Sequence, residues 1–406
     1  MTDASKQSVF DIAVIGAGPA GMTAALLFAS KGFDTALVAP KVNHEDGRTT
    51  ALLQASVDLL DNIGIWNELA PRAAPLSKMR MIDDTGRLIR APETTFDSAE
   101  LDLPAFGYNL LNKDLNRILE EAAVREPNLT FVHALAEGYD FDEAHATVHL
   151  ARDNTISAKL VVAADGRNSP ARSAAGIDVR RWDYPQVAVV LNLEHDRPHG
   201  DASTEFHTPT GPFTLVPLPG RASSLVCVVK PEQADALVAL SDDLLARELE
   251  TRAHSILGKF SIASKPQKFP LSGLTAKRLM GPRLALIGEA AHVFPPIGAQ
   301  GLNLGLRDVA SLGNILSTAK AQSKDIGAHD TLEVYEKQRF TDINSRTAAV
   351  DALNRSLLTD FLPVQFARSA GLYLADKIPP LRRFLMREGI APGTRRKSIG
   401  APQIKE

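Results

Sequence analysis

The sequence predicts an α/β fold built around a parallel sheet, and two observations lead to this prediction. First, an apolar strand at residues 10–15, a helix at 22–31 and a second strand at 34–39 follow one another directly, as in the unit that opens a dinucleotide-binding sheet. Second, two later apolar strands, at residues 160–164 and 283–287, each run into a glycine–acid pair or an acid–glycine pair. We therefore expect these three segments to fold together around one ligand.

The composition is that of an ordinary globular protein. The 406 residues are 44% hydrophobic and 23% charged, and this length suggests two or three structural units. The formal net charge of −3 gives no sign of polyanion binding, so we expect no nucleic-acid partner. The sequence contains neither a Cys/His cluster with metal-ligand spacing nor the Gly-x-Ser-x-Gly elbow of a hydrolase, so no metal site is expected.

Cysteine usage and the N-terminus indicate the compartment. The single cysteine, Cys227, lies in an apolar run at residues 224–229 and is interpreted as a small core residue. One cysteine cannot form an internal disulfide, which fits a reducing compartment. Residues 1–10 carry an acid and lack an apolar core, so they do not read as a secretory signal. Residues 12–30 are uncharged, but their glycine spacing argues against a membrane span, and we expect a cytoplasmic location.

A glycine-rich turn joins the first strand to the first helix, as Gly16-Ala-Gly18-Pro-Ala-Gly21. Gly16 permits the tight turn, Gly18 lets the backbone approach a pyrophosphate, and Gly21 lets helix and strand pack closely. The pyrophosphate then lies at the positive end of the helix dipole. The turn predicts a Rossmann-like dinucleotide site.

One element of that site is missing. An acid usually ends the second strand and binds the adenosine ribose, but this chain has Ala39 followed by Pro40. Loss of a charged hydrogen bond costs about 1.5–3 kcal/mol, which a large cofactor with many contacts tolerates. Glu45 and Asp46 are candidate substitutes from the following loop. The gap counts against NAD(H) as the tightly bound ligand of this turn and does not exclude FAD.

The two later segments add polar groups beyond the first turn. The strand at residues 160–164 ends in Asp165-Gly166 and is followed by a predicted helix start. The strand at 283–287 ends in Gly288-Glu289, and a loop with two prolines and three glycines follows it. A helix near Gly301 is expected to aim several backbone N–H groups at one point.

These three segments resemble the fingerprints of the class A flavoprotein monooxygenases. The sequence is most similar to the ubiquinone-biosynthesis hydroxylases of the UbiH/COQ6 type, over about residues 8–390, and the run at 292–308 is the most specific part. The resemblance implies a Rossmann-like FAD-binding domain with an inserted mixed β-sheet substrate domain and C-terminal helices. It places the discontinuous FAD-binding domain at residues 8–75, 108–178 and 270–345, the substrate domain at 76–107 and 179–269, and a C-terminal helical segment with a basic tail at 346–406.

The periodicity of the remaining sequence predicts further elements. Strands are expected at residues 187–194, 203–218 and 223–230, and short alternating runs at 76–90. Helices are expected at 112–121, 241–257 and 330–362.

The resemblance also assigns residues to the cofactor. Through it, Arg48 lies near the flavin diphosphate, Asp165 belongs to a motif linked to both FAD and the nicotinamide cofactor, and the loop after His292 lies against the isoalloxazine ring. The complete cofactor-binding set is Gly16, Gly18, Gly21, Arg48, Asp165, Gly166, Arg172, Gly288, Glu289, Gly301, Leu302 and Asn303, and the flavin-facing loop contains Pro295, Gly298 and Gly301.

Several of these assignments have structural alternatives. Arg48 is alternatively a solvated loop charge, Asp165 a helix cap, and Arg172 part of a structural ion pair. Glu289 stands where the family has aspartate, which keeps the charge but moves the carboxylate outward by one methylene. His292 is interpreted as a structural or flavin-orienting residue, and no side chain is assigned as a catalytic base.

The implied activity is aromatic hydroxylation with FAD as the cofactor and NAD(P)H as a transient co-substrate. In the family, reduced flavin reacts with O2 to give a flavin C4a-hydroperoxide, which hydroxylates an electron-rich ring. The implied substrate is a prenylated phenol of ubiquinone biosynthesis. Three alternatives remain open: a hydroxylase of a small aromatic acid, a non-catalytic FAD-binding partner of a biosynthetic complex, and a flavin oxidoreductase that transfers no oxygen.

The C-terminal part suggests a further partner. From residue 377 onward the chain has eight Lys or Arg and two Glu, interspersed with apolar residues. This pattern suits a membrane surface, so the protein is expected to be peripheral on the inner membrane face or part of a ubiquinone-biosynthesis complex. The alternative is a helix packed on the FAD-binding domain with a solvated tail.

Overall fold

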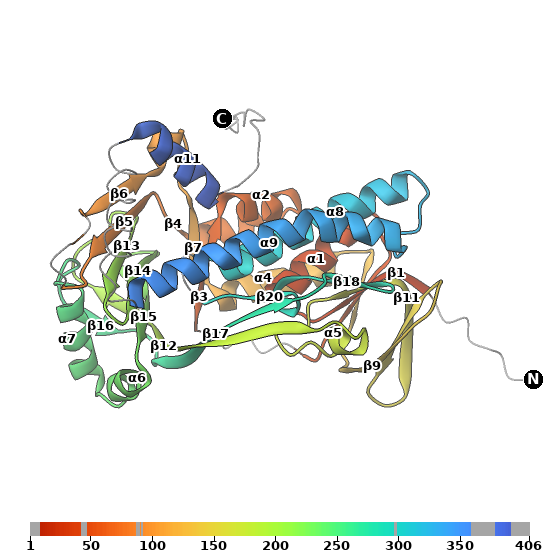
Figure 1. Ribbon diagram of the computed structural model, residues 1–406, viewed down its shortest axis with the longest axis horizontal. Helices are drawn as coiled ribbons and strands as arrows, with labels where there is room; N and C mark the ends of the chain where they lie inside the picture. The colour runs from red at the N-terminus through yellow and green to blue at the C-terminus, as the bar shows by residue number, and fades with distance from the viewer. Residues whose placement is uncertain are drawn as a thin grey trace, which may run out of the picture.

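The computed structural model describes residues 9–41, 47–86, 90, 92–295, 299–358 and 378–390. At one end of the elongated molecule lies a sheet whose five central strands are parallel, in the order β19-β11-β1-β2-β8 (Figure 1). The strands of this first sheet are β1 (Val9–Ile15), β2 (Thr35–Val38), β8 (Leu129–Val132), β11 (Asn154–Ala163) and β19 (Leu284–Leu286), with antiparallel additions β9 (Ala136–Phe141), β10 (Ala146–Leu150) and β18 (Met280–Gly281). The predicted α/β fold class is confirmed.

The first sheet forms because its strands are apolar on both faces. Residues 12–15 of β1 and 160–163 of β11 are buried, as is all of β2, which is typical of parallel strands covered by helices. Helices of this part of the molecule are α1 (Pro19–Ser30), α2 (Gln54–Asn62), α3 (Trp66–Leu69), α4 (Asn112–Arg125) and α5 (Pro170–Ala174), with the 3-10 turns η1 (Ala70–Arg72) and η3 (Gly288–Ala290). A third, small sheet consists of β3 (Thr49–Leu53), β7 (Gly107–Leu111) and β4 (Ala74–Pro75), and β7 is its central strand.

A second, mixed sheet occupies the other end of the molecule. Its strands are β20 (His292–Val293), β17 (Gln267–Ala276), β12 (Val179–His195), β15 (Ala222–Val229), β14 (Gly211–Leu218), β13 (Ala202–Thr208), β5 (Lys78–Asp83) and β6 (Thr94–Asp97), and β16 (Phe260–Ile262) pairs with β12. The long strands β12 and β17 pair with each other from residue 179 to residue 190 and run side by side between the two ends of the molecule (Figure 1). Helices α6 (Pro231–Val238) and α7 (Asp242–Arg252) and the turn η2 (Ser98–Leu101) complete this part.

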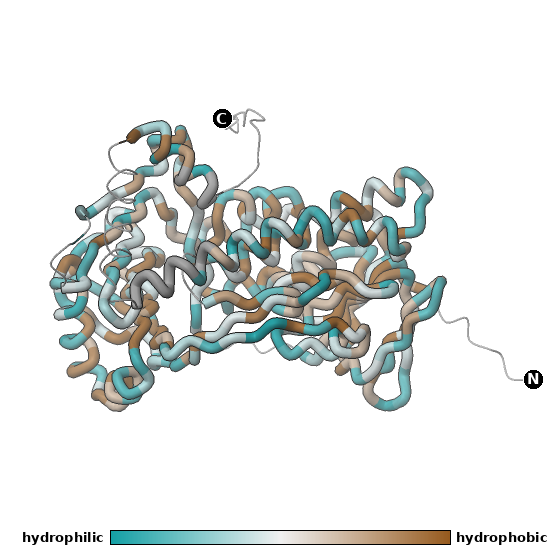
Figure 2. Tube along the Cα trace, viewed as in Figure 1, coloured by the Kyte–Doolittle hydropathy of each residue, from teal (hydrophilic) through white to brown (hydrophobic). Residues whose placement is uncertain are grey.

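Two long helices follow, and the second of them contacts strands of both sheets. Helix α8 (Gln300–Ala321) packs on α1, where Gly313 permits close approach because a Cβ there would lie 2.6 Å from Leu27 Cδ2. Helix α9 (His329–Leu358) packs on α8 and runs along the length of the molecule (Figure 1). Figure 2 shows polar and apolar residues following one another along α9, as its position at the surface requires. Helix α11 (Pro379–Ile390) lies against η2 at the outer end of the second sheet.

Within the described residues the structure confirms the type of the predicted elements and corrects some bounds, while residues 87–89 and 359–362 of the predicted segments and residues 391–406 of the basic tail lie outside the described residues. The helix predicted at 241–257 ends at Arg252, because His254 and Ser255 have positive φ and turn the chain. The segment at 203–218, expected as strand broken by Pro and Gly turns, is a hairpin of the two strands β13 and β14. The strand predicted at 187–194 begins eight residues earlier, at Val179, since its pairing with β17 extends it.

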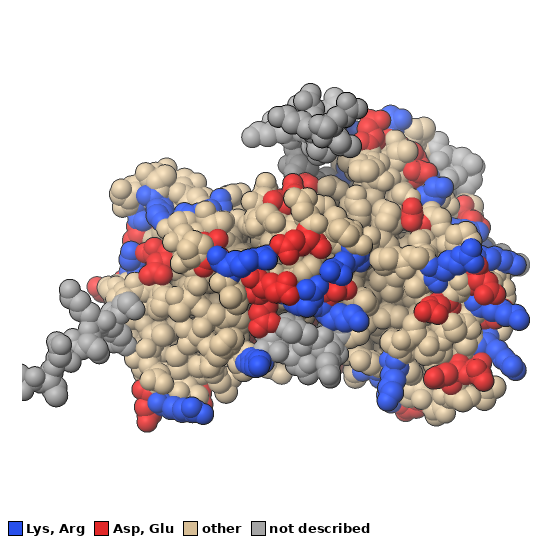
Figure 3. All heavy atoms as spheres, turned by 180° about the vertical axis from the view of Figure 1, so that it is seen from behind, with Lys and Arg blue, Asp and Glu red and all other residues tan. Residues whose placement is uncertain are grey.

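The surface and the helices bear on possible partners. On the face drawn in Figure 3, Lys and Arg are interspersed with Asp and Glu, in agreement with the small net charge. Within the described ranges, every helix is too short or too polar to cross a bilayer. The same ranges hold no group of three or more His, Cys, Asp or Glu side chains placed to bind a metal. Cys227 is buried, and burial raises the pKa of its thiol to about 11.

The hydrogen bond from α9 to the first sheet gives a test of the packing. The buried Tyr335 hydroxyl donates to the Leu286 carbonyl at 2.7 Å, whereas the buried Tyr139 hydroxyl has no partner among the described residues. Tyr335→Phe leaves that carbonyl without its donor, so we expect a loss of about 1–3 kcal/mol in the free energy of unfolding. Tyr139→Phe is the matched control and should cause no loss. Urea unfolding of both variants measures this, and equal losses would contradict the assignment.

Candidate active site

The three fingerprint segments converge at the carboxyl ends of three adjacent strands. The Ala164 N–H donates to the Ile15 carbonyl at 2.8 Å, and the Ile287 N–H donates to the Ala163 carbonyl at 3.0 Å. Strands β1, β11 and β19 therefore end at one edge of the sheet, where ligands of such sheets bind.

Glycines make the contact between the first and second fingerprints possible. Gly16 has φ +106°, and a Cβ there would lie 2.3 Å from the Ala164 carbonyl oxygen. A Cβ at Gly21 would lie 1.9 Å from the Gly16 carbonyl oxygen and 3.1 Å from the Ala164 Cβ. Any other residue at these two positions forces the turn and the strand end apart.

The third fingerprint is packed against the first in the same way. Gly288 in η3 has φ +58°, and a Cβ there would lie 3.4 Å from the Ala20 Cβ of α1. A Cβ at Gly305 of α8 would lie 3.0 Å from the Gly288 Cα and 3.7 Å from the Ala20 Cβ. The starts of α1, η3 and α8 are thus in close contact.

Gly18 differs from the other glycines of the turn. It is exposed, has an ordinary φ of −72° as the N-cap of α1, and a Cβ there would meet no protein atom within 4 Å. The first turn of α1 has no acidic side chain and no side-chain cap, so its N–H groups face this open space. The turn therefore fits a bound phosphate group.

Buried polar atoms without protein partners also fit a bound cofactor. The Asp165 Oδ2 accepts the Ala171 N–H of α5 at 3.1 Å, but the buried Oδ1 has no partner among the described residues. The Gln54 Oε1, in the stretch that follows Arg48, is likewise buried and has no hydrogen-bond partner among the described residues. Burial raises the pKa of Asp165, and hydrogen bonds from Ser169 and Ala171 oppose this shift. Asp165 thus accepts an N–H of the first turn of α5, whose N-cap is Ser169, with one oxygen and has its other oxygen without a partner among the described residues.

Arg172 links the second fingerprint to the third. Its buried guanidinium donates from Nη1 to the Ala290 carbonyl at 2.7 Å and from Nη2 to the Arg167 carbonyl at 3.0 Å. Burial lowers the pKa of Arg172. The side chain therefore joins the Asp165 corner to η3 through backbone carbonyls rather than through a carboxylate.

Glu289 points toward solvent. Its carboxylate is 58% exposed, and its Oε2 lies 3.6 Å from the Nε of Arg167. Gly166, with φ +83°, leaves open space where its Cβ would be. Glu289 and Arg167 thus lie at the outer edge of the site.

Helix α8, which follows the proline–glycine loop, begins beside the other two fingerprints. Pro295 is buried, Gly298 lies outside the described residues, Gly301 is exposed with open space at its Cβ position, and Leu302 is half-buried. These positions precede or open α8, whose N-cap Ala299 is left-handed with φ +53°.

Asn303 holds the start of α8 in place. Its Oδ1 accepts from the Leu53 N–H at 2.8 Å and from the Ser56 hydroxyl at 2.7 Å. Its Nδ2 donates to the Ala51 carbonyl at 2.7 Å and to the Ala299 carbonyl at 2.6 Å. With all four hydrogen-bonding positions of the amide satisfied, this side chain ties α8 to β3 and α2.

Arg48 and the ribose side of the site are only partly described. The exposed Arg48 guanidinium lies 5.3 Å from the ring centroid of Phe269, on β17. Ala39 is buried at the end of the second strand region. Glu45 and Asp46, the candidate substitutes for the missing acid, lie outside the described residues.

A buried charge cluster beside the site was not anticipated as such from the sequence. The Asp308 carboxylate, fully buried in α8, accepts from the Gly288 N–H, from His292 Nε2 and from Arg339 Nε of α9. His292 Nδ1 is buried and has no partner among the described residues. The spacing of Gly305 and Asp308, three apart on a helix, is the sequence signal that places both on one face toward Gly288.

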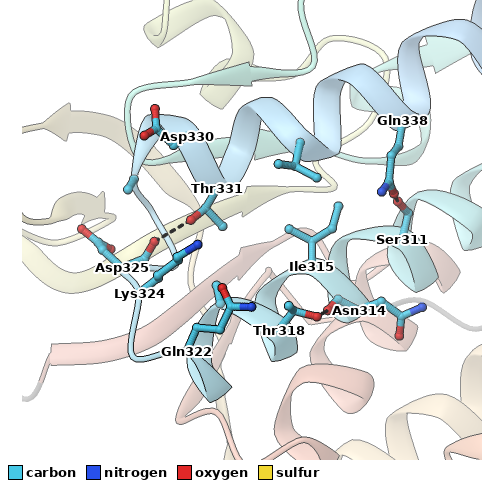
Figure 4. A pocket seen from close by; sticks show the side chains of 13 residues that line it. Ser311, Asn314, Ile315, Thr318, Gln322, Lys324, Asp325, Asp330, Thr331 and Gln338 are labelled. Atoms are coloured by element: carbon cyan, nitrogen blue, oxygen red, sulfur yellow. Dashed lines mark hydrogen bonds between the residues drawn. The ribbon is translucent and has the colours of Figure 1, made fainter.

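A cavity of the described structure lies away from the fingerprints. It has a volume of about 710 Å³ and lies between the C-terminal part of α8 and the start of α9. Figure 4 shows Ile315 and Thr318 of α8 facing Thr331 and Gln338 of α9 across it, with Thr331 bonded to the Asp325 carbonyl. None of its lining residues belongs to a fingerprint, so we do not assign it to the cofactor.

Comparison with known proteins identifies the family. A family model described as an FAD binding domain matches residues 9–346. The ubiquinone hydroxylase UbiL of Rhodospirillum rubrum is 34% identical over 409 residues, covering 98% of this chain and 93% of that protein. This chain belongs to the UbiH/COQ6-type class A flavoprotein monooxygenases.

Other family members and solved structures agree with this assignment. The 3-demethoxyubiquinol 3-hydroxylase of Escherichia coli is 31% identical to this UbiH/COQ6-type chain, over 92% of the chain and 96% of that protein. PqsL, described as a probable FAD-dependent monooxygenase from Pseudomonas aeruginosa, superposes with a TM-score of 0.76 at 23% identity, over 90% of this chain and all of PqsL. The p-nitrophenol 4-monooxygenase PnpA from Pseudomonas putida gives 0.75 at 20% identity, over 94% and 97% of the two chains. At such identities the two structures show the shared fold.

Two glycine substitutions distinguish protein packing from cofactor space. Gly21→Ala introduces a Cβ against the Gly16 carbonyl, so both the melting temperature of the apoprotein and its FAD content should fall. Gly18→Ala adds a Cβ that meets no protein atom, so the apoprotein should melt as the wild type does while FAD affinity falls at least tenfold. Differential scanning fluorimetry and flavin fluorescence titration measure the two effects. Unchanged FAD binding by Gly18→Ala would contradict a phosphate at this turn.

Proposed function

We propose that this protein uses FAD, NAD(P)H and O2 to hydroxylate the ring of a prenylated phenol in ubiquinone biosynthesis. The observation that carries the proposal is the convergence of three fingerprints around an open glycine turn. Beside the same segments, Asp165 Oδ1 and Gln54 Oε1 are buried and have no partner among the described residues. The relatives UbiL and the 3-demethoxyubiquinol 3-hydroxylase, each similar to almost the whole chain, support the ring substrate.

The residues of the site have distinct roles in this proposal. The turn at Gly18 and the first N–H groups of α1 bind the FAD diphosphate, and Arg48 lies nearby to balance its charge. Asp165 Oδ1 accepts a hydrogen bond from the cofactor, as does the Gly288-Glu289 turn. The segment from Pro295 to Asn303, with Gly298 within it, borders the isoalloxazine ring. When bound, FAD supplies the redox chemistry and the activation of oxygen.

The protein's own contribution is to position the substrate and keep the site dry. Asn303 fixes the start of α8 against β3 and α2, and Arg172 fixes the Asp165 corner against η3. Positioning of this kind lowers the barrier because the reacting groups lose no further freedom when they meet.

An apolar region at the outer end of the second sheet suits a prenyl chain. The side chains of Phe106 and Met386 are buried there, and the partly buried residues around them are Met79, Phe96, Leu101 and Leu103. The Phe106 carbonyl accepts from the Gln54 N–H at 3.2 Å, so this cluster adjoins the segment that carries one of the unpartnered oxygens. We place the prenyl chain of the substrate along this region.

Helix α11 covers that cluster and is proposed as the contact with an anionic membrane surface. Its inner face is fixed by Met386 and by the ion pair of Arg382 with Glu100, at 2.7 Å. Its outer face exposes Arg383, Phe384 and Arg387, and Phe384 is 58% exposed. A large aromatic ring between two arginines is typical of helices that lie on anionic bilayers.

The activity is tested by product mass. Purified protein should be yellow, should oxidise NAD(P)H faster with a prenylated phenol than without one, and should yield a product heavier by one oxygen. A hydroxybenzoate is the matched control for the alternative small-acid substrate. Protein that stays colourless after reconstitution with FAD would refute the proposal, whereas a product that gained hydrogen and no oxygen would identify a reductase.

The membrane contact is tested by reversing charge on α11. Each arginine near an anionic surface contributes roughly 1 kcal/mol, so Arg383→Glu with Arg387→Glu should weaken binding at least tenfold. The control pair, Arg72→Glu with Arg247→Glu, makes the same change in net charge at exposed residues elsewhere. Co-sedimentation with phosphatidylcholine vesicles containing phosphatidylglycerol measures both. Equal binding by the two double variants would rule out α11 as the contact.

A further inference from the structure

The Asp308 carboxylate accepts hydrogen bonds from three other segments around the third fingerprint. Its Oδ2 accepts from the Gly288 N–H at 3.1 Å and from His292 Nε2 at 2.7 Å. Its Oδ1 accepts from Arg339 Nε at 2.8 Å. One fully buried carboxylate on α8 therefore contacts η3, β20 and α9.

This carboxylate is charged in the folded protein. Burial by itself raises the pKa of Asp308, but His292 and Arg339 outweigh burial and hold the pKa below its usual range. The Arg339 guanidinium is almost completely buried and balances the charge. Hydrogen bonds to an ionised acceptor are stronger than neutral ones, which strengthens the bond that Asp308 accepts from the Gly288 N–H.

Gly288 lies where the starts of α1 and α8 meet η3, so a small movement of Gly288 shifts these segments relative to one another. Its left-handed backbone lies beside Ala20 of α1 and Gly305 of α8, and a Cβ at Gly305 would lie 3.0 Å from the Gly288 Cα. The start of α1 is where the diphosphate is placed, and Glu289 follows Gly288 directly. A shift of the Gly288 turn therefore changes the walls of the flavin site on two sides.

We propose that Asp308 is a positioning residue for the flavin. Through the Gly288 N–H and His292 its carboxylate fixes the third fingerprint, and so sets the affinity and reduction potential of the bound FAD. This inference rests on the proposed placement of FAD at the same turn. Wild-type FAD binding is therefore measured first, because its absence would refute the placement, whereas the variants below test Asp308 itself.

The first test compares two carboxylates that share one arginine. Asp342 on α9 also pairs with Arg339, at 2.5 Å, and is partly exposed, but its other ion-pair partners among the described residues are Arg307 and Arg346 rather than Gly288 or His292. Asp308→Asn should weaken FAD binding at least tenfold and shift the flavin midpoint potential to more positive values, because the Arg339 charge is no longer balanced beside the site. Asp342→Asn should lower the melting temperature of the apoprotein and change the FAD Kd less than twofold. Wild-type Kd and potential in Asp308→Asn would overturn the proposal.

A second variant separates positioning from stability. Asp308→Leu combined with Arg339→Met removes both buried charges together, so the apoprotein should unfold at a higher urea concentration than Asp308→Asn. The Gly288 N–H still lacks its acceptor, so FAD binding should remain at least tenfold weaker than in the wild type. Recovery of both stability and FAD affinity would show that Asp308 is only structural and would overturn the proposal.

A third test uses amide hydrogen exchange in the wild-type apoprotein and therefore does not depend on whether a variant folds. The Gly288 amide should exchange its hydrogen at least tenfold more slowly than the Gly18 amide, for which no acceptor is recorded, as seen by nuclear magnetic resonance. Equal exchange rates would mean that the carboxylate does not hold the turn, and would overturn the proposal as well.

Discussion

The close approach of backbone to backbone at the glycine turns is the constraint on which the rest of the site depends. The turn after β1 lies against the end of β11, and the starts of α1, η3 and α8 touch one another at Ala20, Gly288 and Gly305. Contacts this short exclude side chains and water from between the segments. The polar groups of the fingerprints are thereby forced to one edge of the sheet, where they surround the space left open at Gly18.

Around this core, buried polar side chains connect segments that lie far apart in the chain. Asn303, Arg172 and Asp308 each use their hydrogen-bonding groups on backbone atoms or buried side chains of another segment. Removing one of these side chains costs more free energy of folding than the net contribution of its hydrogen bonds, because several buried groups then lose their partners. They hold the loop ends that the glycines bring together.

Much of this arrangement was predictable from the sequence, because glycine spacing and apolar strands are local signals. The turn at Gly16, the corner at Asp165 and the start of α8 near Gly301 lie where periodicity and motif placed them. The partners of Asn303 lie 250 residues earlier in the chain, and a single sequence carries no record of that pairing. For the same reason the sequence identified Asp308 only as the end of a motif, since Arg339 comes from a helix whose register against α8 is set by tertiary packing. The ion pair of Glu289 with Arg167 likewise joins two different fingerprints, so the local sequence carries no record of it.

The long strands β12 and β17 have a mechanical consequence. Both belong to the second sheet and extend toward the first, paired with each other on both sides of an irregularity between Asp183 and Val187. A two-stranded ribbon bends and twists as an elastic body, whereas a loop swings freely. Any displacement of the second sheet is therefore opposed by a restoring force and carried along the ribbon to β20, which pairs with the end of β17 and contains His292. A force on the far sheet thus also acts on β20, the strand that precedes Phe294 and Pro295.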